Sequence, residues 1–351
     1  MGAVTQDQDY ALIIGIAHYP HLKSLQGPIE DARRVAHWLK GPGGLPWQNV
    51  KVIESLGLEH ERPVIDEINK GFDEIFARAE AYNKERPRRP VRRLYVYFAG
   101  HGCSRERNHL ALIMANADRR NLNRAMNSTE YRNALARRMF PEQIYLFDCC
   151  RKYDGRITGH GPDWTSDDTE EDVQGLTQVV MYAAGFRQAA HERSMRWSVR
   201  RGLFTQALME GLEGAAATAS GVITSAGLGA YVQRRLAVLA KSEKVRQCYT
   251  GDTQGEKQHL ILASGVEPWR REVSVTLPID ASRIVVNDEH GDTVWTQVTA
   301  PGQTQAALHL TLGLYTIKVE PTGVSMTIDL LPDLDGNAYP LDLSGTYSCH
   351  G

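Results

Sequence analysis

Apolar runs without polar interruption alternate with longer amphipathic segments over the first 265 residues, and this alternation constrains the fold most strongly. The runs at 11–16 and 94–98 lack the alternation of a strand exposed on one face, so they predict strands buried on both faces. The segments 31–39 and 63–82 carry apolar residues at helical spacing. Strands that alternate with helices predict an α/β fold with a mostly parallel sheet flanked by helices.

The same patterns mark the other elements of this region. They predict further strands at 50–53, 144–147, 179–183 and, last, 259–263, and helices at 128–139, 203–212 and 228–240. Ser128 is the expected N-cap of its helix. The sheet should therefore have six strands, and its chemistry should lie at their carboxyl ends.

The pattern changes after residue 265, where helical spacing stops. Short segments of alternating polar and apolar residues follow, separated by turn residues at 273–277, 283–286, 293–295, 308–312, 315–319 and 325–330. This pattern predicts a small antiparallel β-sandwich. We therefore expect a catalytic domain at 1–265 and a β-sandwich domain at 266–351, which fits the prior of about two domains for a chain of this length.

Two predicted strands end in chemically reactive residues. One leads into Ala-Gly-His-Gly at 99–102 and the other into Asp-Cys-Cys at 148–150. A Cys thiol becomes a strong nucleophile when a neighbouring base takes its proton, and adjacent strand ends are close in space. His101 and Cys150 are therefore a candidate dyad. The alternative is that Cys150 is a small apolar core residue and His101 a structural hydrogen bonder.

Composition limits the other classes of function. The formal net charge is −2, so no basic excess indicates a nucleic-acid partner or an anionic membrane. Five cysteines in 351 residues do not make a disulfide scaffold, and the adjacent Cys149 and Cys150 are poorly placed to bridge each other. The start resembles no signal peptide and no run is long enough to span a membrane, so we expect a cytoplasmic protein with reduced thiols.

Five segments in order resemble the caspase and metacaspase family of cysteine proteases, in a form expected of a prokaryote. Residues 97–102 are similar to its histidine motif and 147–150 to the metacaspase cysteine motif, with weaker likeness at 11–32, 188–192 and 202–208. In that motif the nucleophile is the second residue after Asp, which selects Cys150 over Cys149. The sequence departs from the pattern at Ala99, where Ser is frequent, and at 151–153, where metacaspases usually have His-Ser-Gly.

The resemblance also implies a caspase-like fold and a substrate pocket lined by Asp31 and Asp148. Two carboxylates in a partly buried pocket repel each other and favour a cation, so we expect cleavage after Arg and, second, after Lys. Animal caspases hold a substrate Asp with Arg residues, one of which would fall near Leu25. The alternative is that Asp31 is only a helix N-cap. The expected oxyanion donors are the backbone N–H groups of Gly102 and Cys150.

Control of the protease is expected in the loop 151–175 and in the basic segment before Gly202. Candidate self-cleavage points are Arg151, Lys152, Arg156, Arg193, Arg196, Arg200 and Arg201, which are otherwise solvated charges. The acidic run 163–172 reads as an exposed loop without EF-hand spacing, so we expect no metal and no cofactor, and Ca²⁺ activation lacks support. The basic run 86–93 reads as a connector from helix to strand.

Cysteine endopeptidase is thus the leading hypothesis, with protein or peptide substrates and an activating protease or regulator as partners. The resemblance implies a role in regulated proteolysis, cell death or defence against phage. Two alternatives stay open: a catalytically silent caspase-like scaffold that binds partners through its β domain, and a peptide ligase of the same fold.

Overall fold

The computed structural model describes residues 6–164, 173–194, 200–333 and 336–344. The chain forms two compact units, one made of Met1–Met209 with Thr224–Ala263 and the other of Glu210–Ile223 with Ser264–Gly351. The sequence-based division at residue 265 left 210–223 in the first domain, because these residues lie at the end of the predicted helix 203–212 and before the predicted helix 228–240.

A six-stranded sheet forms the centre of the first unit, with the order β13-β9-β7-β3-β1-β2. Its strands are β1 (Asp9–Gly15), β2 (Val50–Glu54), β3 (Arg93–Gly100), β7 (Glu142–Cys149), β9 (Thr177–Tyr182) and β13 (Thr250–Gly255). All neighbours pair in parallel except β13, which runs antiparallel to β9. Every residue of β1, β3 and β7 is buried, so the predicted mostly parallel sheet is confirmed.

The sixth strand is not the one that we predicted. Residues 261–264 form β14 outside this sheet, and the edge position is taken by Thr250–Gly255. All six residues of that strand are exposed. An edge strand with no buried face carries no apolar pattern, so the sequence offered no signal for it.

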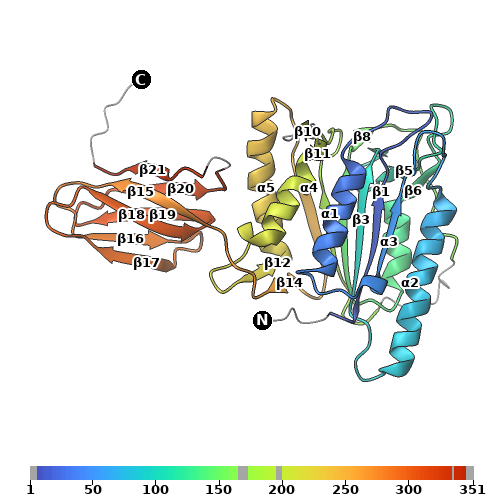
Figure 1. The fold of residues 1–351 in the computed structure, drawn as a ribbon, viewed down its shortest axis with the longest axis horizontal. Helices are drawn as coiled ribbons and strands as arrows, with labels where there is room; N and C mark the ends of the chain where they lie inside the picture. Colours follow the sequence, from blue (N-terminus) through green and yellow to red (C-terminus); the bar gives the residue numbers. More distant parts are fainter. Residues whose placement is uncertain (1–5, 165–172, 195–199, 334–335, 345–351) are drawn as a thin grey trace. The chain divides into compact units, whose positions relative to one another are not determined.

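Helices cover both faces of the sheet (Figure 1). One face carries α1 (Pro28–Lys40), α4 (Leu203–Glu210) and α5 (Ser225–Ser242), and the other carries α2 (Ile65–Glu85) and α3 (Ser128–Ala136). Short helical turns lie at Trp47–Asn49 and Gly211–Ala215. Among the described residues, no helix has both the length and the apolar character needed to cross a membrane.

Two local expectations need correction. The N-cap of α3 is Asn127, whose Oδ1 accepts hydrogen bonds from the backbone N–H groups of Thr129 and Glu130. In the predicted exposed loop 163–172, Asp163 is exposed, but Trp164 packs edge-on against Phe72 at 5.3 Å between ring centroids. The other positions of that run, 165–172, lie outside the described residues.

A second, small sheet continues the chain beyond the carboxyl ends of β3 and β7. It has the order β6-β5-β4-β8, from β4 (Gly102–Ser104), β5 (Ala111–Ile113), β6 (Ala125–Asn127) and β8 (Lys152–Tyr153). Because β4 follows β3 and β8 follows β7, the short links at His101 and at 150–151 lie between two sheets. This arrangement restrains both ends of each link.

The second unit contains a three-stranded and a four-stranded sheet around one apolar core, as the alternating pattern predicts. The first sheet joins β18 (Gln305–Thr311), β15 (Arg270–Thr276) and β21 (Tyr339–Asp342), and the second joins β17 (Thr293–Val298), β16 (Arg283–Asn287), β19 (Gly313–Glu320) and β20 (Ser325–Leu330). Neighbouring strands are antiparallel except β15 and β21. We did not predict β21, a four-residue strand that contains Pro340.

Candidate active site

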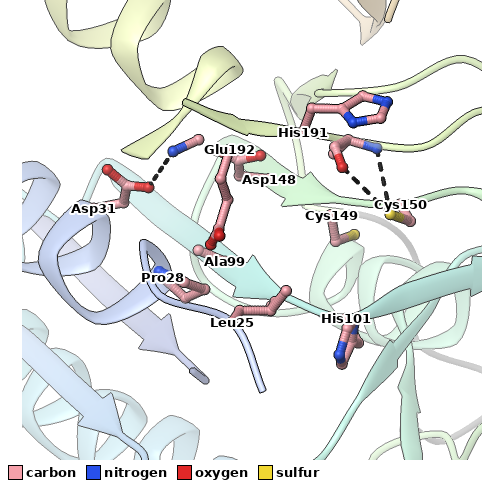
Figure 2. A pocket seen from close by; sticks show the side chains of 13 residues that line it. Leu25, Pro28, Asp31, Ala99, His101, Asp148, Cys149, Cys150, His191 and Glu192 are labelled. Atoms are coloured by element: carbon pink, nitrogen blue, oxygen red, sulfur yellow. Dashed lines mark hydrogen bonds between the residues drawn. The ribbon is translucent and has the colours of Figure 1, made fainter. Parts of the chain in front are cut away.

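The register of two parallel strands brings His101 and Cys150 to the same level. Gly100 at the end of β3 lies opposite Cys149 at the end of β7, and the two residues of interest come next. Both line one pocket at the carboxyl end of the sheet (Figure 2). The predicted meeting of the two strand ends is therefore present in the structure.

The two adjacent cysteines have different surroundings. Cys149 is 2% exposed and packs within the apolar core. The Cys150 Sγ lies beside Ala190, accepting from its N–H at 3.3 Å and lying 3.6 Å from its carbonyl oxygen. A Cβ on Gly102 would lie 2.7 Å from the Cys150 carbonyl oxygen, so only glycine lets the backbone after His101 approach so closely. These contacts favour Cys150 as the reactive thiol and leave Cys149 as a core residue.

The imidazole of His101 is oriented by a backbone carbonyl. Its Nε2 lies 2.6 Å from the carbonyl oxygen of Lys23, in the loop between β1 and α1. A carbonyl only accepts, so Nε2 carries a proton and Nδ1 of the neutral ring is left to accept one. Sequence reasoning found no third group that orients His101, because a main-chain oxygen belongs to every residue and leaves no signal in the residue types.

Burial shifts the pKa values of the dyad in opposite directions. It lowers the pKa of His101 below 6.5 and raises the pKa of the Cys150 thiol above 9.0. The hydrogen bond to Lys23 partly opposes the first shift, and the N–H of Ala190 partly opposes the second. Near neutral pH both groups are therefore uncharged, so a reaction at the Cys150 thiol would need a base to take its proton.

Both predicted pocket carboxylates are buried and face the dyad's pocket. The Asp31 Oδ2 accepts from the backbone N–H of Gly202 at 2.8 Å. The Asp148 Oδ2 accepts from the N–H and the hydroxyl of Thr205 at 3.1 and 2.6 Å. The helix that contains Asp31 begins at Pro28, so the N-cap alternative for Asp31 is wrong.

A third carboxylate, Glu192, lines the same pocket (Figure 2). It begins the short strand β10 (Glu192–Ser194), which pairs with β11 (Arg200–Gly202). Its Oε1 accepts from the backbone N–H groups of Gly27 at 2.8 Å and Gln26 at 3.1 Å, at the start of α1. Sequence reasoning did not single out Glu192, because only the fold brings residue 192 beside residues 26 and 27.

The pocket is strongly acidic. Burial, opposed by the hydrogen bonds from Thr205, raises the pKa of Asp148 to about 6. Burial and then the charge of Asp148 raise the pKa of Asp31 well above its ordinary value, and Arg201 only partly opposes this. Among the residues that the structure describes, no Lys or Arg forms an ion pair with Asp31, Asp148 or Glu192. The described part of the chain also has no cluster of three metal-ligating side chains.

The candidate self-cleavage residues differ in accessibility. Arg151 is 3% exposed, its guanidinium lies 4.3 Å from the centroid of the Tyr182 ring, and its backbone N–H donates to Gln188. That burial argues against cleavage after Arg151. The others in the described part of the chain are more accessible: Lys152, Arg156 and Arg200 are exposed, and Arg193 and Arg201 are half-buried; Arg196 lies outside the described residues.

Comparison with known proteins identifies a family. The family model for the caspase domain matches residues 8–258. Among solved structures, caspase-1 from Spodoptera frugiperda is 16% identical, with a TM-score of 0.45, 74% of this chain covered and 91% of that one. The Drosophila initiator caspase Dronc is 10% identical, with a TM-score of 0.45 and coverage of 76% and 87%. No curated protein matches the sequence.

Proposed function

Because the chain belongs to the caspase-domain family, we propose that it is a cysteine endopeptidase that cleaves proteins or peptides after arginine and, less efficiently, after lysine. The observation that carries this proposal is a pocket beside Cys150 and His101 in which three carboxylates converge without an ion pair among the described residues. Such a pocket favours a ligand that supplies the missing cation.

The choice between arginine and lysine follows from geometry. A guanidinium offers five N–H donors in a fixed plane and binds carboxylates in pairs, whereas an ammonium is a compact charge that is costlier to strip of water. The Asp31 Oδ1 is buried and accepts no hydrogen bond from any described residue, so it is available to accept from such a group. A substrate aspartate would instead bring a fourth carboxyl group, and no cation, into the pocket.

The proposed reaction begins when the arginine side chain enters the pocket and sets the scissile carbonyl against Cys150. The Sγ–H proton moves to Nδ1 of His101 while Sγ forms a bond to the carbonyl carbon. We propose that the N–H groups of Gly102 and Cys150 stabilise the resulting oxyanion. The C–N bond then breaks, and His101 gives its proton to the leaving amine. Water, deprotonated by His101, hydrolyses the thioester and releases Cys150.

A matched pair of variants tests the dyad. Cys150→Ala should abolish cleavage of an arginine peptide, because it removes the sulfur that forms the acyl intermediate. Cys149→Ala is the control and should retain most of the activity if the protein remains folded. An active-site thiol probe should label wild type and Cys149→Ala only. Equal activity in the two variants would contradict the assignment, and a wild type that neither cleaves nor reacts would favour a silent scaffold.

We further propose that cleavage in exposed basic segments controls the enzyme, as regulated proteolysis in cell death or phage defence would require. Lys152, Arg156 and Arg200 are exposed, and Arg201 directly precedes Gly202, which contacts both pocket aspartates. A cut after Arg201 would therefore free one wall of the pocket. Intact-mass analysis should show fragments ending at these residues in wild type but not in Cys150→Ala. Fragments in both would indicate another protease.

A further inference from the structure

Tyr19 is a buried residue that contacts His101 but has no role in the reaction proposed above. It lies in the loop between β1 and α1, the same loop that presents the Lys23 carbonyl to His101. The side chain is 1% exposed, and its ring packs against the His101 imidazole with 4.5 Å between centroids and a tilt of 48°. The ring therefore supports the face of the imidazole that it contacts.

The hydroxyl of Tyr19 is inserted into a β-ladder. Strands β4 and β5 pair antiparallel with Gly102 opposite Leu112, so the next pair outward is His101 and Ile113. A hydrogen-bonded antiparallel pair normally exchanges two N–H···O bonds. Here only one is direct, from the Ile113 N–H to the His101 carbonyl oxygen at 2.9 Å.

The second bond of this pair runs through the tyrosine. The His101 N–H donates to the Tyr19 hydroxyl oxygen at 2.8 Å, and that hydroxyl donates to the Ile113 carbonyl oxygen at 3.2 Å. The phenol thus separates His101 from Ile113 while satisfying both backbone groups. A glycine at position 100 makes room for it, because a Cβ there would lie 2.7 Å from the hydroxyl oxygen.

From this insertion we infer that Tyr19 is a positioning residue for His101, and the inference rests on the proposed peptidase function. The phenol opens the ladder where β3 passes into β4, and so sets the direction in which the His101 side chain leaves the backbone. The same loop fixes the ring, with the Lys23 carbonyl on Nε2 and the Tyr19 ring against its face. Together these contacts aim Nδ1 at the side of the pocket that holds Cys150.

The first test is Tyr19→Phe, which keeps the ring and removes only the hydroxyl. No group then bridges the His101 N–H and the Ile113 carbonyl. The two strands either move together to form the direct hydrogen bond or leave both groups without a partner, and His101 shifts. We expect kcat for an arginine peptide to fall by about tenfold to a hundredfold, as for a misplaced catalytic group. KM should change less than about twofold, since the described hydrogen bonds of the Tyr19 hydroxyl reach His101 and Ile113 and not the pocket carboxylates.

Tyr131→Phe is the matched control. Tyr131 is also fully buried, and its hydroxyl donates to the Asn69 side chain in another part of the unit. Losing that bond should lower the thermal midpoint about as much as Tyr19→Phe does, with kcat unchanged. Equal kcat losses in both variants would show that Tyr19 acts only through stability, and would overturn the proposal.

A readout that does not depend on peptide cleavage separates this proposal from the proposed function. Alkylation of Cys150 by iodoacetamide at pH 7 reports whether His101 can take the thiol proton. The rate, read by mass mapping, should fall in Tyr19→Phe toward the rate of His101→Ala and stay at the wild-type value in Tyr131→Phe. A wild type that shows this pattern but cleaves no peptide would refute the peptidase and keep the positioning role.

Gly100→Ala reaches the same contact from the other side and serves if Tyr19→Phe does not fold. Its methyl group would displace the phenol without removing it, so kcat and the alkylation rate should again fall with KM little changed. A folded variant that lacks or displaces the hydroxyl could instead keep the wild-type alkylation rate and the wild-type kcat. That result would overturn the proposal, even if the protein is a peptidase.

Discussion

The amino ends and the carboxyl ends of β3 and β7 differ in how their buried charged side chains are paired. At the amino ends, Arg93 lies opposite Glu142 and the pair is closed at 2.6 Å, with both side chains almost fully buried. Lys257 adds a second cation at 2.5 Å from the same carboxylate. At the carboxyl ends, Asp148 of β7 and Asp31 of α1 are also buried, and within the described part of the chain their partners are uncharged hydrogen-bond donors.

The pKa values show what the difference means. Burial alone would raise the pKa of Glu142, but Arg93 and Lys257 hold it below its ordinary value. Without such a partner, burial raises the pKa of Asp148 to about 6. A carboxylate paired inside the fold is structural, whereas an unpaired one at a strand's carboxyl end is suited to a cation from another molecule.

The largest expected effect is on catalysis at the carboxyl end. Asp148→Asn removes the negative charge that would hold the substrate arginine, and breaking a buried ion pair costs about 3–5 kcal/mol. We therefore expect kcat/KM for an arginine peptide to fall by about 10²-fold to 4 × 10³-fold. Steady-state kinetics checks this, with Glu142→Gln as the control that should keep kcat/KM. An Asp148→Asn enzyme as efficient as wild type would remove the basis for the predicted specificity.

The free energy of unfolding should respond in the opposite order, with a larger loss from Glu142→Gln than from Asp148→Asn. Glu142→Gln leaves Arg93 with a weakened partner in a buried site, so the free energy of unfolding should fall by about 3 kcal/mol. Asp148→Asn removes an unpaired buried carboxylate and should leave the free energy unchanged or higher at pH 7. Denaturant unfolding of both variants compares them directly. A loss from Asp148→Asn as large as that from Glu142→Gln would mean that Asp148 is structural too.

Glu192 should contribute less than the two aspartates. It is only partly buried and is already held by the N–H groups of Gln26 and Gly27, so part of its charge is offset. We expect Glu192→Gln to lower kcat/KM for an arginine peptide by about tenfold, mainly through KM. The ratio of arginine to lysine cleavage is the second readout. No change in either quantity would exclude Glu192 from the specificity pocket.

The smallest effect is the pH dependence of substrate binding. The raised pKa of Asp148 means that the folded protein holds this proton more tightly than the unfolded chain does. The stability that the protonated Asp148 side chain contributes is fully present below pH 3.8 and is lost as pH rises through about 6. A substrate cation needs the ionised form, so KM for an arginine peptide should fall severalfold as pH rises from 5 to 7. The same KM profile in Asp148→Asn would assign the dependence elsewhere.

Residues next to strongly patterned strands could be predicted, and residues that act through the main chain could not. His101, Asp148 and Cys150 follow buried apolar runs, so their positions followed from the alternation of strands and helices. The Lys23 carbonyl acts through an atom that every residue has. The bridging position of Tyr19 depends on how the loop between β1 and α1 packs against the link from β3 to β4. No periodic pattern in the sequence indicates such a contact.

Charged residues gave the sequence analysis its weakest signals. Arg93 ends a basic run that we took for a connector from helix to strand, yet it is the first residue of β3 and is buried opposite Glu142 in the parallel register. Glu192 and Asp31 are far apart in the chain and meet only because β10 and β11 fold against the start of α1. Pairing across a sheet or between loops decides the role of such residues, and one sequence does not show it.

The central claim is that the pocket selects for a positive charge, and one peptide series tests it most directly. The peptides differ only at the residue before the scissile bond, which is arginine, lysine, citrulline or aspartate. Citrulline has the shape of arginine without its charge. We predict that kcat/KM for arginine exceeds that for lysine, and exceeds that for citrulline by about 10²-fold or more, with aspartate the poorest. Cleavage after citrulline or aspartate as fast as after arginine would contradict it.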